Sequence, residues 1–396
     1  MFLSALSVLA FLAGCSSGGD YEAITASDIQ EEADLTKIAY DFKVHPLKSA
    51  DPLDGIGGIK SWGDVMLART SDDKKILRFD NYQLTAVLDR LGRGPGEYYF
   101  IEDFSYDEAN NCIYIENDSN LVTYDATTME FKGKQGVNIS IQNCLNLGDQ
   151  MLFYGTFLDE RNRSVADENT VRFVKQSMIL VDRDERDLRK GVVLYREGRL
   201  RRMLLGYPEL FYVNPKNRST CFTGFVNTIV TFDDEKATPI YRFKLGSDPV
   251  DEEADELLEI EEANIEELNG ILQRITQGAT GPRIGNVFNI MVDDGTISFR
   301  VTYSWPDGSI GIPSDYLYFV HRDNKTKVYK HLRIPGLSMD VNPTGANGNH
   351  QIAIIENLGE LAIDESVPLS PLAEQIVAEL KKQNDDNPVM LEFRFK

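Results

Sequence analysis

The side chains that most often catalyse reactions or bind metals are scattered along the chain. The four histidines are His45, His321, His331 and His350. They follow no metal-ligand spacing, and only His321 and His331 could face each other across a hairpin. The sequence has no CxxC pair and no GxSxG at a strand-to-helix turn, so neither a zinc ribbon nor a hydrolase with a nucleophile elbow is indicated. No catalytic residue, metal site or cofactor is predicted.

Carboxylates are numerous, and two places in the chain put them side by side. Glu102 and Asp103 could line a channel and act as acid, base or calcium ligand. Asp293 and Asp294 precede Gly295, and Asp-Gly between two strand-like runs is a strong signal for a tight hairpin. We therefore predict a turn at Gly295 and no catalytic pair there.

Basic side chains gather in one stretch of this acidic chain. They are Arg183, Arg186, Arg189, Lys190, Arg196, Arg199, Arg201 and Arg202. The last four, Arg196, Arg199, Arg201 and Arg202, could bind an anion, an acidic glycan or the acidic face of a partner. The acidic residues interleaved with them favour a solvated loop with local ion pairs instead.

Cys15 has the most specific local context of the four cysteines. An apolar run, residues 2–13, is too short to span a bilayer and suits the core of a signal peptide. It ends in Leu12-Ala13-Gly14-Cys15, the pattern of a bacterial lipobox, in which the thiol accepts a diacylglyceryl group. No Lys or Arg precedes the run, although signal peptides normally begin with positive charge. We expect a signal peptide at residues 1–14, lipidation at Cys15 and a tether over residues 15–30.

The other cysteines, Cys112, Cys144 and Cys221, lie in strand-like runs. Buried free thiols are expected, with one disulfide as the alternative.

The charge balance limits the partners. Lys and Arg total 41 against 63 Asp and Glu, which gives a net charge of −22. Such a chain repels phosphate backbones, so nucleic acid is excluded as a partner. With 42% hydrophobic residues the chain can bury a sizeable core.

Short alternating strands dominate the elements that must position these residues. A strand ending in Asp, followed by a polar turn and another strand, recurs at Asp80, Asp125, Asp182, Asp233 and, more loosely, Asp323. The steps are 45, 57 and 51 residues, then 90 with an apparent insertion. Steps of this size fit one four-stranded propeller blade each.

A sixth blade is expected at the C-terminal end of the chain, where residues 389–395 form a good strand. It could close the ring by pairing with residues 37–44, which removes exposed sheet edges. We predict an all-β fold, a single six-bladed β-propeller over residues 31–396. A β-sandwich or a two-domain β protein is the alternative.

Two helices interrupt the strand pattern. Asp248-Pro249 can start a helix that forms an acidic insertion over about residues 249–277. A short C-terminal helix is predicted over about residues 370–383, with Leu372, Ile376, Val377 and Leu380 facing inward.

The segment Leu91-Gly-Arg-Gly-Pro-Gly-Glu-Tyr98, followed by Ile101 to Tyr106, resembles the six-bladed β-propeller lipoproteins of Bacteroides-type bacteria, which carry a GxGPGE[YF] turn and a lipobox. The resemblance is clear over about residues 30–135. It implies a six-bladed ring in the cell envelope, in a family whose role is largely unassigned, and it carries over no catalytic residue. From the residues themselves, Gly94-Pro95-Gly96 is a turn, with Gly96 at positive φ.

These observations favour a lipid-anchored binding or scaffolding module of the outer membrane, on its periplasmic or surface face, with a glycan or envelope protein as partner. The competing class is a propeller enzyme acting on carbohydrate through carboxylates in the central channel. The enzyme should bring two or more acids together in that channel with shifted pKa values, whereas the binder should expose an aromatic or apolar patch.

Overall fold

The computed structural model describes the chain in segments. They are residues 22–24, 29–158 without 54, 102 and 118, 165–167, 170–172, 175–198 without 186, 211–213, 220–225, 228–232, 237–245, 262–264, 266, 270, 283–304 without 294, 315–356 without 324, 363–383 and 387–396.

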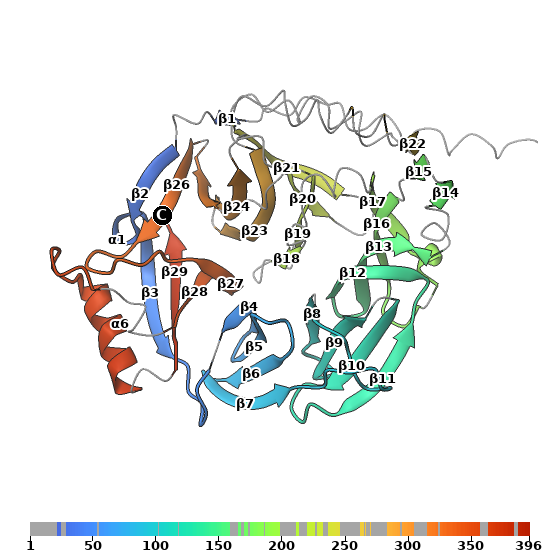
Figure 1. Ribbon diagram of the computed structural model, residues 1–396, viewed down its shortest axis with the longest axis horizontal. Helices are drawn as coiled ribbons and strands as arrows, with labels where there is room; N and C mark the ends of the chain where they lie inside the picture. The colour runs from blue at the N-terminus through green and yellow to red at the C-terminus, as the bar shows by residue number, and fades with distance from the viewer. Residues whose placement is uncertain are drawn as a thin grey trace, which may run out of the picture.

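The described strands form six blades around a central axis, two of which share one eight-stranded sheet (Figure 1). Blade 1 contains β4 (Ile56–Trp62), β5 (Val65–Thr70), β6 (Ile76–Asp80) and β7 (Gln83–Leu88). Blade 2 contains β8 (Phe104–Asp107), β9 (Cys112–Asn117), β10 (Asn120–Asp125) and β11 (Phe131–Gly136). Blade 3 contains β12 (Ile139–Asn146), β13 (Gln150–Phe157), β16 (Lys175–Asp182) and β17 (Val192–Gly198), with the short 3-10 helix η2 (Leu188–Lys190) before β17.

The remaining blades follow in chain order, with the innermost strand first. Blade 4 contains β18 (Phe211–Val213), β19 (Thr220–Phe225), β20 (Thr228–Phe232) and β21 (Ala237–Leu245). Blade 5 contains β23 (Arg283–Asp293), β24 (Thr296–Ser304), β25 (Asp315–Arg322) and β26 (Lys325–Arg333). Blade 6 contains β27 (Pro343–Asn347), β28 (His350–Ile355), β29 (Val389–Phe395) and β3 (Ala39–Pro46).

The recurring aspartates mark one position in four of the first five blades. Asp80, Asp125, Asp182 and Asp323 lie at or just beyond the end of the third strand, at the turn that leads into the fourth, whereas Asp233 lies outside the described residues. The predicted repeat is therefore confirmed as the outer hairpin of the blade. The sixth blade lacks this turn because its fourth strand, β3, comes from the N-terminal part of the chain.

Ring closure joins the two ends of the sequence, as predicted. Strand β3 pairs antiparallel with β29, with Ala39 opposite Phe395 and Pro46 opposite Val389. The innermost strands of blades 6 and 1 also touch, since Gly345 of β27 pairs in parallel with Ile59 of β4.

Two further strands extend the rim of the ring beyond the expected four per blade. Strand β2 (Ile29–Asp34) adds in parallel to β26 of blade 5, and β1 (Glu22–Ile24) adds in parallel to β21 of blade 4. Residues 22–24 and 29–30, which we assigned to the tether, are therefore strand residues. The one-turn helix α1 (Leu35–Ile38), capped by Asp34, turns the chain from β2 into β3.

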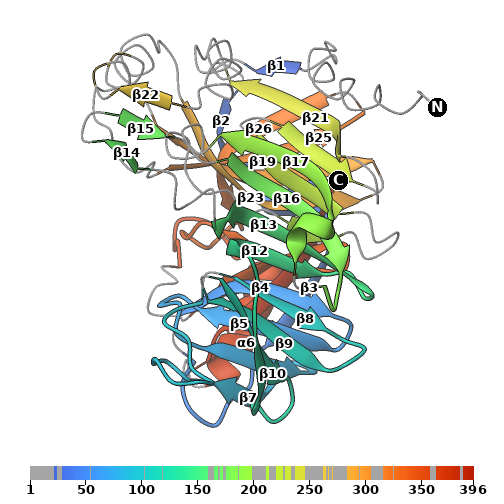
Figure 2. The ribbon, with the colours of Figure 1, turned by 90° about the vertical axis from the view of Figure 1, so that its right-hand side faces the viewer.

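Part of the predicted helical insertion is β-structure. Residues 262–264 form β22 (Glu262–Asn264), which pairs antiparallel with β15 (Thr170–Arg172), and β15 pairs with β14 (Val165–Asp167). This small sheet lies to one side of the blades (Figure 2). The helix prediction is wrong for residues 262–264 because pairing with a distant strand overrides their local helix preference. Glu266 and Gly270 are helical, and the rest of the predicted insertion lies outside the described residues.

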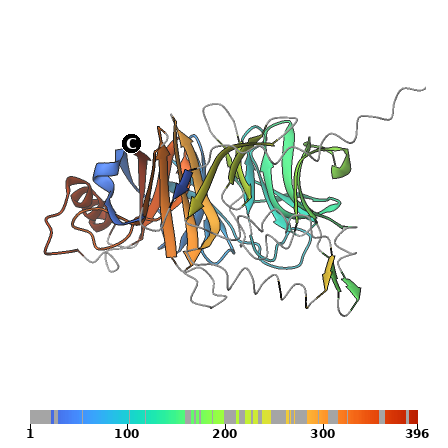
Figure 3. The ribbon, with the colours of Figure 1, turned by 90° about the horizontal axis from the view of Figure 1, so that it is seen from above.

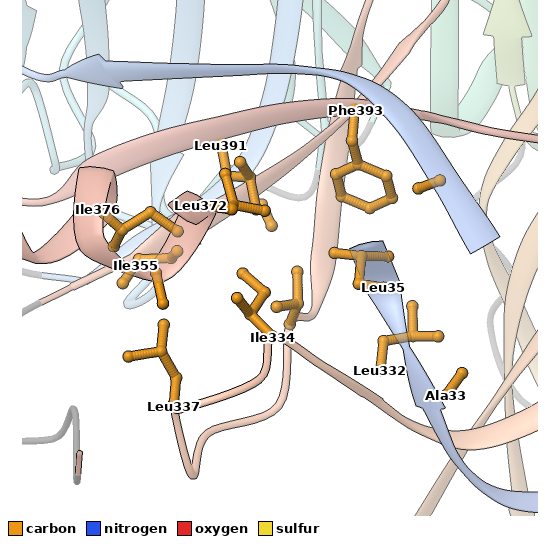
Figure 4. Packing of buried hydrophobic residues seen from close by; sticks show 14 of the residues in the cluster. Ala33, Leu35, Leu332, Ile334, Leu337, Ile355, Leu372, Ile376, Leu391 and Phe393 are labelled. Atoms are coloured by element: carbon orange, nitrogen blue, oxygen red, sulfur yellow. The ribbon is translucent and has the colours of Figure 1, made fainter. Parts of the chain in front are cut away.

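The C-terminal helix is confirmed as α6 (Pro371–Lys382), which starts at the cap residue Ser370 and lies outside blade 6, against β3 and β29 (Figure 3). Its predicted inward residues are all buried. They join the largest core cluster described, in which Leu372 and Ile376 pack near Leu391 of β29 and Ile334 of the loop after blade 5 (Figure 4).

Candidate functional site

The connection between blades 1 and 2, residues 89–103, is called the aromatic loop here. Hydrogen bonds from the Gly92 N–H to the Tyr98 carbonyl (2.9 Å) and from the Tyr98 N–H to the Arg90 carbonyl (3.2 Å) fold its first half back on itself. The Gly94 N–H donates to Glu97 Oε2 at 2.6 Å. The Gly-Pro-Gly-Glu-Tyr sequence thus makes a closed turn, as predicted.

Position 96 of this turn has no room for a side chain, which explains its glycine. Its φ is not positive, so that detail of the prediction is wrong. A Cβ on Gly96 would lie 2.8 Å from Cγ of Phe131, which covers the turn from β11. The close approach of this ring leaves no room for a side chain.

Tyr98 fixes the turn to the body of the propeller. It is fully buried, and its hydroxyl donates to the Lys74 carbonyl (2.8 Å) while accepting from the Arg90 N–H (3.2 Å). Its ring packs edge to face on Tyr124 of blade 2, with ring centroids 6.2 Å apart. Burial raises the pKa of Tyr98 to about 12, so the hydroxyl keeps its proton at any physiological pH.

The two residues that follow Tyr98 point outward. Tyr99 is 53% exposed and Phe100 is 52% exposed, whereas Ile101 is fully buried. Leu91, which bridges to Tyr98 in the turn, is 46% exposed. The Arg93 guanidinium lies over the Tyr99 ring, 5.7 Å from its centroid. Two aromatic rings, a leucine and an arginine are therefore presented together.

The second half of the aromatic loop is tied to a turn of blade 1. The Ile101 N–H donates to the Asp73 carbonyl at 2.8 Å, and Arg69 Nη1 donates to the Ile101 carbonyl at 2.8 Å. Residues 99 and 100 are thus held between two anchored neighbours, and their backbone has little freedom. Side chains on such a fixed backbone lose less entropy when they bind.

A polar network lies where the innermost strands of blades 1, 2 and 3 meet. Lys60 Nζ of β4 contacts Asp103 Oδ1 at 2.5 Å and also donates to the Phe104 carbonyl at 2.9 Å. Asn143 Nδ2 of β12 donates to Asp103 Oδ2 at 2.6 Å. Both oxygens of Asp103 are thereby engaged, while Glu102 lies outside the described residues.

Glu116 of β9 is buried behind this network. Burial, and then the nearby Asp103 carboxylate, raise the pKa of Glu116 well above its usual value. Its Oε1 accepts the Cys144 N–H at 2.9 Å, and the residue is 4% exposed. Burial and Glu116 also raise the pKa of the Cys144 thiol. The network brings two acids together but keeps Glu116 away from solvent.

Asp293, His321 and His331 bind partners within the fold. Asp293 ends β23 at the predicted turn, where Gly295 has φ +78°, and it forms an ion pair with Arg394 of β29. His321 lies opposite Thr326 in the register of β25 and β26 and bonds to its hydroxyl at 2.8 Å. His331 instead bonds Asp340 at 2.7 Å.

The buried cysteines are confirmed as free thiols at Cys112 and Cys144. Nothing is described of the Cys221 side chain, and Cys15 lies outside the described residues.

The structure describes only part of the basic stretch. Arg183 pairs with the buried Asp107 at 3.2 Å, Lys190 pairs with Glu185 at 3.1 Å, and the Arg189 guanidinium lies over Phe157. The backbone of Arg196 in β17 lies opposite that of Ser177 in β16. Arg199, Arg201 and Arg202 lie outside the described residues. The patch proposed for these four arginines stays a prediction.

Within the described residues, no three His, Cys, Asp or Glu side chains are placed to hold a metal ion together. No helix in that same part of the chain is both long and apolar enough to cross a bilayer.

The fold and this loop define a six-bladed β-propeller that displays aromatic side chains beside its second blade. Residues 16–267 match the model of the DUF5128 family, described as 6-bladed beta-propeller. The chain belongs to this family.

A solved structure of a Bacteroides protein has the same fold. The chain is similar to a Bacteroides fragilis protein assigned as exported, with 14% identity and a TM-score of 0.59 over 95% of this chain and all of that one. It is also similar to a DUF4221 family member from Bacteroides vulgatus, with 11% identity and a TM-score of 0.47 over 91% and 98% of the two chains. No curated protein sequence matches the chain.

Proposed function

We propose that this propeller is a non-enzymatic binding module, held at the bacterial cell envelope by a lipid on Cys15, whose aromatic loop contacts a protein partner. The observation that carries the binding role is the display of Tyr99 and Phe100, each about half exposed, on a backbone fixed by the buried Tyr98. Aromatic and arginine side chains in such positions supply most of the binding energy in protein interfaces.

The chemistry of the loop favours a protein over a glycan. Leu91 and Phe100 offer apolar surface and no hydrogen bond to a sugar hydroxyl, whereas Arg93 beside Tyr99 matches the anchors found at protein interfaces. A glycan partner is the alternative outcome of the experiment below.

The enzyme alternative requires carboxylates that a substrate can reach in the channel. Asp103 has both oxygens engaged by Lys60 and Asn143, and Glu116 is buried. These contacts favour a structural role for the two acids and support the binding proposal.

Photo-crosslinking in cells tests the partner. Benzoylphenylalanine at position 100 should give an adduct whose digest contains peptides of a second protein, and Tyr99→Ala in the same chain should remove it. Tyr316 is the matched control position, because it is 39% exposed and also lies under an arginine, Arg300. Equal adducts at positions 100 and 316, or none at either, would contradict the proposal. An adduct whose digest contains no second protein and whose added mass is removed by periodate would assign a glycan instead.

The lipid anchor rests on the Leu12-Ala13-Gly14-Cys15 pattern and the apolar run before it. An alkyne fatty acid fed to cells should label the wild-type protein and the Ser16→Ala control but not Cys15→Ser. Labelling of Cys15→Ser to the wild-type level would refute lipidation at this residue.

A further inference from the structure

The chain that follows the proposed lipidation site is bound to one side of the ring. Strand β2 runs along the outer edge of blade 5, where Glu31 pairs with Lys330 at 2.5 Å and Glu32 pairs with Arg333 at 3.3 Å. Ala33 at its end is buried in the core cluster that also contains residues of blade 6. Backbone pairing, two ion pairs and a buried side chain together fix the position of β2.

Strand β1 fixes the chain earlier still. Its residues Glu22 to Ile24 pair in parallel with Phe243 to Leu245 at the outer edge of blade 4. The chain thus follows the rim from blade 4 to blade 5 and, after α1, becomes the outer strand of blade 6 (Figure 1).

The chain length between Cys15 and the first of these strands limits how far the ring can lie from a lipid on Cys15. From Cys15 to Glu22 the chain reaches at most about 25 Å when fully extended. A compact domain of this size is roughly 55 Å across. A lipid at Cys15 therefore keeps the outer edge of blade 4 close to the membrane, whereas the opposite rim can lie a full domain width farther away.

We propose that the rim formed by β1 and β2 on blades 4 and 5 faces the membrane, so that the aromatic loop between blades 1 and 2 points away from it. In a ring of six, blades 1 and 2 lie opposite blades 4 and 5, and Figure 1 shows β7 across the ring from β1. This orientation rests on the proposed lipid anchor at Cys15. It is set by the tether, because the net charge of −22 gives the propeller no general attraction to anionic lipid.

Spin labels on the native lipidated protein test the orientation. The probe is a vesicle of phosphatidylethanolamine and phosphatidylglycerol with a small fraction of nickel-chelating lipid. Single labels replace exposed residues at Gln30 on β2, Val87 on β7 and Lys134 on β11. We expect the Gln30→Cys label to collide with headgroup nickel several-fold more often than the Val87→Cys and Lys134→Cys labels. The unsubstituted protein measures background labelling of its own cysteines.

Equal collision rates at the three positions, or higher rates at Val87 and Lys134, would overturn the orientation. Failure of the anchor gives a different result, because the wild-type protein would then not float with the vesicles at all. A flexible insertion of about 20 Gly and Ser residues after Gly19, with an extended reach of roughly 70 Å, should abolish the difference between the labels. Persistence of the full difference in this variant would show that the tether does not set it.

Discussion

The hydroxyl of Tyr98 donates a hydrogen bond to the backbone carbonyl of Lys74, 2.8 Å away, and so links the aromatic loop to the turn between β5 and β6 of blade 1. The same hydroxyl accepts the Arg90 N–H. One buried atom therefore connects both ends of the turn that presents Tyr99 and Phe100.

Replacing Tyr98 by Phe should destabilise the protein by about 1–3 kcal/mol, because the Lys74 carbonyl and the Arg90 N–H lose a partner inside the fold. Urea unfolding of the two proteins measures the difference. Tyr99→Phe removes a hydroxyl from an exposed ring and should leave the unfolding midpoint unchanged. If both variants unfold at the wild-type midpoint, Tyr98 does not fix the loop.

Gly96→Ala should cost about 1–3 kcal/mol of stability, because its Cβ would overlap the Phe131 ring. Gly133→Ala is the control in the neighbouring strand, since nothing lies within 4 Å of the added atom. In a Phe131→Ala background, which removes the ring atoms, the cost of Gly96→Ala should fall, and a double-mutant cycle from urea unfolding measures this coupling. An unchanged cost in that background would mean that the ring is not the obstacle.

The contact between blades 6 and 1 also depends on a glycine and can be tested in the same way. A Cβ on Gly345 would overlap the Ile59 carbonyl oxygen, where β27 and β4 meet. Gly345→Ala should therefore weaken the contact between blades 6 and 1 and lower the urea midpoint. Gly58→Ala in β4 adds its Cβ to open space and is the matched variant. Similar midpoints for both variants would argue against close packing at this joint.

Glu116 should make stability depend on pH. Its pKa in the folded protein lies well above the usual 4.5, so the folded state binds a proton that the unfolded state releases. The contribution to stability is full below pH 4.5 and is lost as pH rises toward the raised pKa. Glu116→Gln keeps an acceptor for the Cys144 N–H but does not ionise. Urea unfolding at several pH values should show the stability of the Gln variant rising relative to that of the wild type as the pH increases above 4.5. A difference that is independent of pH would contradict the raised pKa.

The outer hairpins could be predicted from the sequence because their signal is local. An aspartate ends the third strand and the chain turns within a few residues, as at Asp80 and Gln83. The closing strand β3 could be proposed because an outer strand has to cover an otherwise exposed edge. Strands β1 and β2 gave no such signal. Each is short, β2 carries two adjacent glutamates, and both pair with strands more than two hundred residues away.

The candidate site could be predicted only in part. The Gly-Pro-Gly sequence indicates a turn, but the consecutive residues Tyr98, Tyr99 and Phe100 do not alternate in character. Only the structure shows that the first is buried and the next two are exposed. Likewise the neighbouring acids Asp103, which lies just before β8, and Glu116 of β9 resemble many other acids in the sequence.

The pairing of β3 with β29 sets the timing of folding. The two strands come from opposite ends of the sequence, so the ring cannot be completed until the last residues of the chain are available. A chain that emerges N-terminus first keeps β3 unpaired until β29 has been synthesised. Contacts of such long sequence separation form slowly and leave a strand edge open to aggregation in the meantime. Completion of the propeller is therefore a late step that requires the whole chain, and a truncated product would be left as an open array of blades.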